Sequence, residues 1–192
     1  MRVPETSLCA LCAGLLILAG CGNDRPAVIE EAPAPSARTR DFRSARAGLE
    51  VRLPANLQVV AADRPPAVFR ATLGQPFVSS YAYRRKEQLP RDAKELDDAR
   101  KRLATAVRRR DAGYRLASAR STEVDGARAV ELVGEQTISR QRVRVRSLHV
   151  FKGEAEYVVE IIAPSAGFSR FDRRLTPLVK RTLKVTGRVR GS

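Results

Sequence analysis

Cysteine, tryptophan, histidine and methionine are all scarce in this 192-residue chain. Its cysteines, Cys9, Cys12 and Cys21, lie near the N-terminus, and none follows them. Residues 22–192 therefore hold no disulfide, no thiol nucleophile, no thiol redox pair and no zinc site built on cysteine. Such a domain must be held together by its hydrophobic core, and the chain is long enough for a single core of this kind.

Long apolar runs are also missing, with the exception of the stretch from Leu8 to Gly20. This stretch follows Arg2, and it is shorter than the roughly 20 apolar residues that a membrane-spanning helix needs. Its length is typical of a signal-peptide core. Leu18-Ala19-Gly20-Cys21 at its end resembles the lipobox of bacterial lipoproteins. The alternatives are an ordinary secretory signal, in which Cys21 is incidental, and a buried core helix.

The lipobox resemblance implies a signal peptide over residues 1–20 and a diacylglyceryl thioether on Cys21, usually with an N-acyl chain such as palmitate. Two or more acyl chains anchor a protein stably. We therefore expect a lipid-anchored protein on the extracytoplasmic face of the cell membrane, or in the outer membrane if the host has two membranes. The membrane is thus an expected partner.

Residues 21–46 are rich in proline, alanine and charge, include Ala32-Pro33-Ala34-Pro35-Ser36, and have no apolar period. This composition predicts a disordered tether. A single folded domain is expected over residues 47–187, followed by a basic tail at 188–192.

Acidic residues are few, and the net charge is +15. The excess of arginine reflects either a GC-rich genome or attraction to an anionic lipid or wall polymer. Nucleic acid is not an expected partner, because an exported protein seldom meets it.

Period-2 patterns predict strands, and a change to helical spacing predicts a helix between them. Asp92 and Glu95 form a capping-box-like start for this helix, and Gly113 marks its end. A second helix is expected near the C-terminus, where mostly apolar residues recur at helical spacing from Phe168 to Thr182. Pro177 interrupts this run, so either the helix kinks there, or a short turn precedes a helix with Thr176 as its N-cap and Pro177 at its first position. The second alternative is favoured. The predicted strands are Leu49–Leu53, Leu57–Ala61, Ala67–Leu73, Phe77–Arg85, Tyr114–Thr122, Ala127–Glu135, Ser139–Phe151 and Ala155–Ala163. Short turns make neighbours antiparallel, so the fold class is α+β, with one antiparallel sheet flanked by helices.

The order of the predicted strands and helices also resembles that of a known fold. Leu53-Pro54 ends an opening strand, Tyr81 and Tyr83 precede the long helix, and the segments Val124–Leu132 and Arg146–Phe151 lead into Tyr157-Val158-Val159. The layout resembles the PsbP-like (Mog/PsbP) α/β/α sandwich of small bacterial lipoproteins of the LpqN and DcrB kind. Because that fold contains binding and assembly proteins, the resemblance implies a partner-binding module and carries over no catalytic residue.

Catalytic signatures are absent. The sequence has no Gly-x-Ser-x-Gly, no P-loop and no Gly-x-Gly-x-x-Gly. A hydrolase would have to use His149, the single histidine, with a serine such as Ser147 or Ser165. A structural role for His149 is favoured, because it lies between Leu148 and Val150 in a predicted strand. No metal or cofactor is expected, since one histidine without a thiol makes a transition-metal site improbable.

The remaining unusual feature is a row of arginines in the strand predicted from Ser139. Alternation places Arg140, Arg142, Arg144 and Arg146 on one face. They are the candidate site for an anion or a partner, because the guanidinium group binds phosphate and carboxylate in a bidentate manner. The alternative is that they pair with Glu131, Glu135 or Glu160 on neighbouring strands. After Arg146 we expect the phase to slip, because Leu148 and Val150 take the arginine face.

The sequence thus favours a lipid-anchored, extracytoplasmic, non-catalytic binding or assembly module of the bacterial cell envelope. Its expected ligand is an envelope protein, an anionic lipid or a wall polymer. The alternatives are a carrier that holds a lipid or other hydrophobic ligand between sheet and helix and, less favoured, a hydrolase that uses His149.

Overall fold

The computed structural model describes residues 33–190, so Cys21 and the predicted signal peptide lie outside the described residues. Two helices and ten strands occur in this range. Their order is β1 (Thr39–Ser44), β2 (Leu49–Pro54), β3 (Gln58–Ala61), β4 (Ala67–Thr72), β5 (Phe77–Arg84), α1 (Ala93–Arg110), β6 (Arg115–Val124), β7 (Ala127–Ile138), β8 (Gln141–Lys152), β9 (Ala155–Pro164), α2 (Ser165–Thr182) and β10 (Lys184–Val185).

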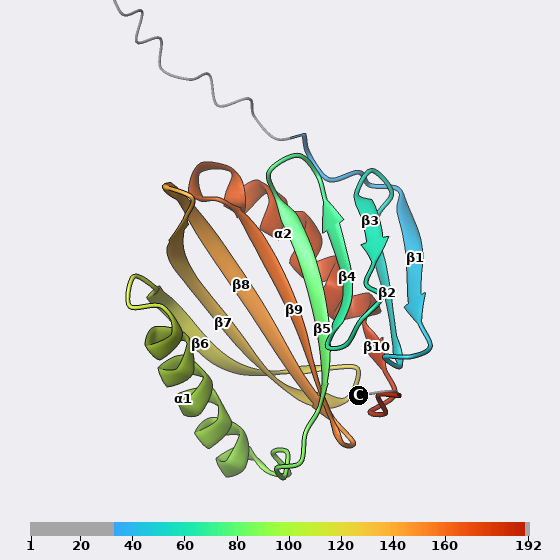
Figure 1. Cartoon of the computed structure of the whole chain (residues 1–192), viewed down its shortest axis with the longest axis vertical. Helices are drawn as coiled ribbons and strands as arrows, with labels where there is room; N and C mark the ends of the chain where they lie inside the picture. The colour runs from blue at the N-terminus through green and yellow to red at the C-terminus, as the bar shows by residue number, and fades with distance from the viewer. Residues whose placement is uncertain (1–32, 191–192) are drawn as a thin grey trace, which may run out of the picture. The chain divides into compact units, whose positions relative to one another are not determined.

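The strands form two antiparallel sheets, which confirms the α+β class but not the expectation of one sheet. The large sheet has seven strands in the order β3-β4-β5-β9-β8-β7-β6, and the small sheet is β1-β2-β10. α1 packs on β6 and β7, whereas α2 packs on β8 and β9 and also on β2 (Figure 1). α2 therefore lies between the two sheets, and the main core joins residues of all three layers, such as Val51, Phe171 and Val159.

α1 begins as its capping residues predict. The Asp92 side chain accepts a hydrogen bond from the Glu95 amide at 2.8 Å, and the Glu95 carboxylate accepts one from the Arg91 amide at 2.7 Å. The helix ends at Arg110, and its C-cap is Asp111. Its apolar side, which includes the buried Leu96 and Ala99, packs on the large sheet.

α2 is continuous through Pro177, so the prediction of a helix beginning at Thr176 is wrong. Proline removes the hydrogen bond to the carbonyl four residues earlier, here that of Arg173. Pro177 and Arg173 both lie on the exposed side, where the carbonyl can accept a hydrogen bond from solvent instead. The buried side continues across the proline and holds the helix to the core through Phe168, Phe171, Leu175 and Val179.

The folded domain begins before residue 47, so residues 39–46 of the predicted tether belong to the fold. β1 pairs with β2 over its whole length, and Phe42 packs against Phe69 with ring centroids 4.7 Å apart. β1 was missed because it is an edge strand whose side chains are mostly exposed and charged, so no apolar alternation marks it. Arg190 of the predicted basic tail is also attached to the domain, since its amide donates to the Arg46 carbonyl at 2.8 Å.

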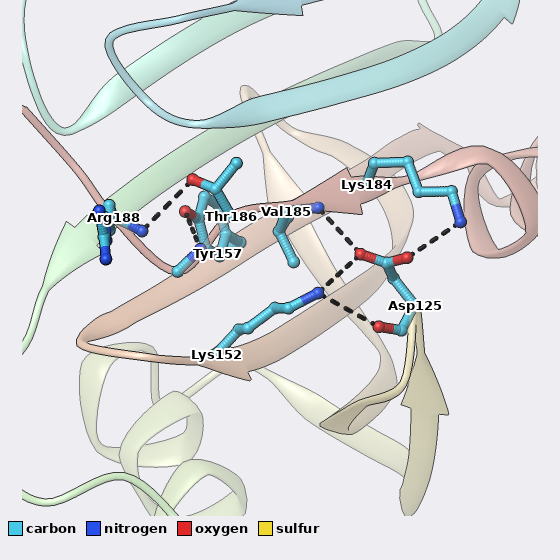
Figure 2. Close-up of polar contacts among 8 residues, drawn as sticks. Asp125, Lys152, Tyr157, Lys184, Val185, Thr186 and Arg188 are labelled. Carbon is cyan, nitrogen blue, oxygen red and sulfur yellow. Dashed lines mark hydrogen bonds and ion pairs between the residues drawn. The ribbon is translucent and has the colours of Figure 1, made fainter.

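The C-terminal segment is fastened by Asp125 in the β6–β7 turn (Figure 2). Its carboxylate accepts hydrogen bonds from Lys152 and Lys184, each at 2.9 Å, and from the Val185 amide at 3.2 Å. Partial burial works to raise the pKa of Asp125, but these bonds outweigh it and lower the pKa to about 2. Asp125 therefore ties β10 of the small sheet to the large sheet.

Candidate functional site

The face of the large sheet that carries α1 is only partly covered. α1 lies over β6 and β7, which leaves the same face of β5, β9 and β8 open. This incomplete cover leaves a cleft of about 440 Å³, with these three strands as its floor and α1 as one wall. Leu103 and Val107 of α1 and Tyr114 provide the apolar part of that wall.

The cleft floor carries polar rows that run across the strands. Glu160 on β9 lies directly opposite Ser79 on β5 and Ser147 on β8. Both serines are buried, and the Ser79 hydroxyl has no hydrogen-bond partner among the described residues. The next row consists of Tyr81, Val158 and His149. The floor therefore has hydrogen-bonding groups in its middle rather than a continuous apolar surface.

Glu156 stands at one side of this floor with both of its oxygens engaged. His149 Nδ1 lies 2.7 Å from Oε1, and Arg85 Nε donates to Oε2 at 2.6 Å. Burial works to raise the pKa of Glu156, but His149 and Arg85 outweigh it and lower that pKa. This group satisfies a carboxylate whose side chain is only 5 % exposed, so its first role is to hold the floor together.

His149 thus lines the cleft, but the described residues provide no nucleophile for it. The Ser147 hydroxyl contacts Glu160 Oε1 at 3.5 Å and makes no hydrogen bond with His149. Ser165 lies at the start of α2, which packs on the opposite face of the sheet. A serine–histidine pair requires a hydrogen bond between the two side chains. The described residues also contain no group of three or more histidine, aspartate or glutamate side chains suited to a metal ion.

Glu160 is the unpaired carboxylate of the cleft floor, since it forms no ion pair with any described residue. Burial raises the pKa of Tyr83 and Tyr114, and the negative charge of Glu160 raises both further. Tyr83 also stacks with Tyr81, with ring centroids 6.3 Å apart. A carboxylate among phenol rings accepts hydrogen bonds and attracts positive charge, so Glu160 is the group best placed to contact a ligand.

Tyr114 keeps its position because Gly134 lies beneath it. A Cβ on Gly134 would stand 2.4 Å from Cζ of the Tyr114 ring, which no real contact allows. The absence of a side chain in the middle of β7 lets the ring close the wall of the cleft. Sequence reasoning missed Gly134 and Glu156, and it named Glu160 only as a possible partner of the arginine row. The available signal was the pair of glutamates four residues apart in a strand that is otherwise apolar on both faces.

The predicted arginine row lies on the other face of the sheet, towards α2. Arg140 is in the β7–β8 turn with a positive φ of 65°, and Arg142 is exposed. Arg144 pairs with Glu135 at 3.4 Å and lies over the Phe168 ring. Arg146 continues in phase with Leu148 and Val150, so the expected phase slip does not occur.

Arg146 is the centre of a largely buried ion network. It donates to Glu131 Oε1 at 2.5 Å and binds Asp172 of α2 through two bonds of 2.7 Å each. Lys180 reaches the other oxygen of Glu131 at 2.6 Å. Two of the three glutamates named as alternative partners therefore pair with the row, while Glu160 faces the cleft. Anion binding stays a prediction for Arg140 and Arg142.

Comparison with known proteins identifies the fold. No family model and no curated protein matches the sequence. The structure is similar to CyanoP, the cyanobacterial PsbP of Synechocystis, with a TM-score of 0.54 and 13 % identity over 88 % of this chain and 99 % of that one. The fold is PsbP-like.

A second neighbour with this fold is LpqN of Mycobacterium tuberculosis, which is described as involved in cell envelope biogenesis. Its TM-score is 0.55 at 13 % identity, over 78 % of this chain and 91 % of that one. A protein from Bacteroides thetaiotaomicron has a TM-score of 0.53 at 11 % identity, over 77 % of this chain and 48 % of that one. Neither helix in residues 33–190 is long and apolar enough to cross a membrane.

Proposed function

We propose that this protein is a lipid-anchored, non-catalytic binding module of the bacterial cell envelope that receives its partner in the cleft beside α1. The cleft itself carries the proposal, because it is open and its floor presents the unpaired carboxylate of Glu160. The lipobox-like residues before Cys21 and the fold shared with LpqN, which is described as involved in cell envelope biogenesis, support the location.

Binding is favoured over catalysis because the cleft lacks a paired nucleophile and base. A hydrophobic carrier is also less favoured. The cavity between the large sheet and α2 is about 10 Å³, which is about the space of one water molecule. The cleft beside α1 is larger, but Glu156 and Glu160 lie in its floor, and burying an unpaired carboxylate against a lipid chain is costly.

The anchor is tested by replacing Cys21 with alanine and following the protein through cell fractionation. Loss of the lipid should move the protein from the membrane fraction to the soluble extracytoplasmic fraction. Cys12→Ala is the matched control and should leave the distribution unchanged. A Cys21→Ala protein that stays in the membrane fraction to the same extent as the unaltered protein would refute the anchor.

The cleft is tested by placing a photo-crosslinking residue at Ala106, which is exposed and lines the cleft. Illumination of native membranes should give a defined adduct from this position. The same residue at Arg173, on the exposed side of α2, should give none. The adduct should also disappear when Glu160→Lys is added, because the substitution reverses the free charge of the floor. Equal adducts from both positions would contradict binding in the cleft.

A further inference from the structure

The described chain begins at one particular end of the domain. Pro33 lies against Gly74 in the β4–β5 turn, with its Cδ 3.9 Å from the position that a Cβ on Gly74 would take. The neighbouring Gln75 accepts a hydrogen bond from Gln141, which directly follows the β7–β8 turn, at 3.2 Å. The chain start, the β4–β5 turn and the β7–β8 turn therefore meet at one end, here named the proximal end (Figure 1).

The proximal end is strongly basic. The start of β6 lies near the β7–β8 turn, because Arg115 pairs with Glu135, three residues before the end of β7. Four residues join Arg115 to the C-terminal end of α1. The arginines of the proximal end are exposed and form no ion pair with any described residue. These arginines are Arg38, Arg108, Arg109, Arg110, Arg115, Arg140 and Arg142.

Among residues 33–190, few acidic groups oppose these charges at the proximal end. Asp111 accepts a hydrogen bond from the Gly113 amide at 2.8 Å, and Glu135 is paired with Arg144. The opposite end, here named the distal end, differs in this respect. It carries an open groove of about 1250 Å³ in which Arg84 and Arg85 are paired with glutamates, while Lys86 and Arg128 have no ionic partner among the described residues.

We infer that the proximal end rests on the headgroups of an anionic bilayer. The inference builds on the proposed lipid anchor at Cys21, about twelve residues before Pro33. At roughly 3.3 Å per residue, these residues extend over at most about 40 Å, so the anchor keeps the proximal end close to the surface. Separate turns and a helix end carry the arginines, and this arrangement fits a flat field of phosphates better than one bound polymer.

This orientation has a consequence for the cleft. The strands of the large sheet run between the proximal and the distal end (Figure 1), so on this surface they stand away from the membrane. The cleft beside α1 then opens sideways and stays accessible to an envelope partner. The distal groove faces away from the bilayer.

Charge reversal at the two ends tests the inference. The chain from Gly22 onwards keeps every described element and lacks both Cys21 and its lipid, so its binding does not depend on the proposed anchor. Its partition is measured by sedimentation with vesicles of about 30 % phosphatidylglycerol in phosphatidylcholine. Arg140→Glu with Arg142→Glu should weaken binding at least about 30-fold, equivalent to about 1 kcal/mol for each arginine.

The matched control is Lys86→Glu with Arg128→Glu at the distal end, which changes the net charge equally. It should weaken binding less than about 3-fold, because these groups lie away from the surface. Equal losses for the two pairs, or binding as tight to pure phosphatidylcholine, would overturn the inference. Release of the Cys21→Ala protein from membranes tests the anchor separately.

A second measurement reports the orientation directly. Residues 22–192 contain no cysteine, so a single introduced cysteine can carry an environment-sensitive fluorophore. Thr137→Cys, near the β7–β8 turn, and Glu87→Cys, in the β5–α1 loop, both place the label on an exposed residue. Anionic vesicles should shift the emission of the label at position 137 to the blue and leave that at position 87 unchanged. The reverse pattern would refute the proposed orientation.

Discussion

The two faces of the large sheet differ in how completely they are covered, and β8 shows the difference residue by residue. On the α2 face, Leu148 and Val150 belong to the core that α2 shares with both sheets, and Arg146 binds Asp172 of α2. On the α1 face, Ser147 and His149 border an open cleft. Both faces contain carboxylates, but those of the closed face are paired, whereas Glu160 on the open face is not.

This difference separates groups that stabilise the fold from groups that are available for binding. A buried charge needs a partner, because removal from water costs several kcal/mol. A charge beside an open cleft keeps contact with water and can exchange that water for a ligand. Substitutions on the closed face should therefore change the stability of the protein, and substitutions on the open face should change its binding.

The largest effect is expected for Arg146→Ala on the closed face. The Arg146 side chain is only 18 % exposed, and its loss leaves the buried carboxylates of Glu131 and Asp172 without their shared cation. Breaking such a network lowers the free energy of unfolding by about 3 to 5 kcal/mol. Urea unfolding measures the loss. Arg142→Ala on the same strand and face is the control and should change stability by less than about 0.5 kcal/mol; equal losses would show that the network does not stabilise the fold.

Gly134→Ala should have a smaller effect and lower the free energy of unfolding by about 1 to 3 kcal/mol, because the new Cβ overlaps the Tyr114 ring. The displaced ring should also widen the cleft and change the near-ultraviolet circular dichroism of its tyrosines. Gly167→Ala in α2 is the matched control, since a Cβ there meets no atom within 4 Å. That substitution should stabilise the protein by about 0.5 to 1 kcal/mol, as expected for glycine replaced in a helix. Destabilisation by both would contradict the role of Gly134.

The tie at Asp125 should give a pH dependence. Its pKa falls from the ordinary 3.8 to about 2 in the folded protein. A lowered folded pKa contributes stability above the unfolded pKa, and this contribution is lost as the pH falls from about 4 to about 2. The side chain is 16 % exposed, and after a discount for screening by water we expect about 1 kcal/mol.

Asp125→Asn should remove this contribution at pH 7 and flatten the decline in stability between pH 4 and pH 2. Unfolding by urea at several pH values measures both effects. Asp63→Asn provides a control on an exposed carboxylate for which no ion pair occurs among the described residues. If the stability of the variant declined between pH 4 and pH 2 as steeply as that of the unaltered protein, Asp125 would be excluded as the source of this decline.

The sequence predicts what local pattern determines. The capping residues mark the start of α1, and alternation locates most strands of the large sheet within a few residues. β1 was missed because its stability comes from pairing with β2 rather than from a pattern of its own. The continuous α2 was missed because tertiary packing of its buried side outweighs the local cost of Pro177.

The candidate site was beyond local pattern for a different reason. A cleft exists only because α1 lies over β6 and β7 and not over the middle of the sheet, and no residue of β5, β8 or β9 encodes that offset. The partners of the arginine row show the same limit. Glu131 could be proposed as a neighbour across strands, but Asp172 comes from a helix far along the chain.

The smallest effect on stability, and the sharpest test of the comparison, is expected for Glu160→Gln on the open face. Glu160 has no ion pair to lose among the described residues, and glutamine keeps its size and a hydrogen-bond acceptor for Ser147. The free energy of unfolding should therefore change by less than about 0.5 kcal/mol. Crosslinking from position 106 should nevertheless fall sharply, because the negative charge of the cleft floor is gone. A loss of stability as large as that for Arg146→Ala would show that Glu160 is a structural group, and the cleft floor would then offer a partner no unpaired carboxylate.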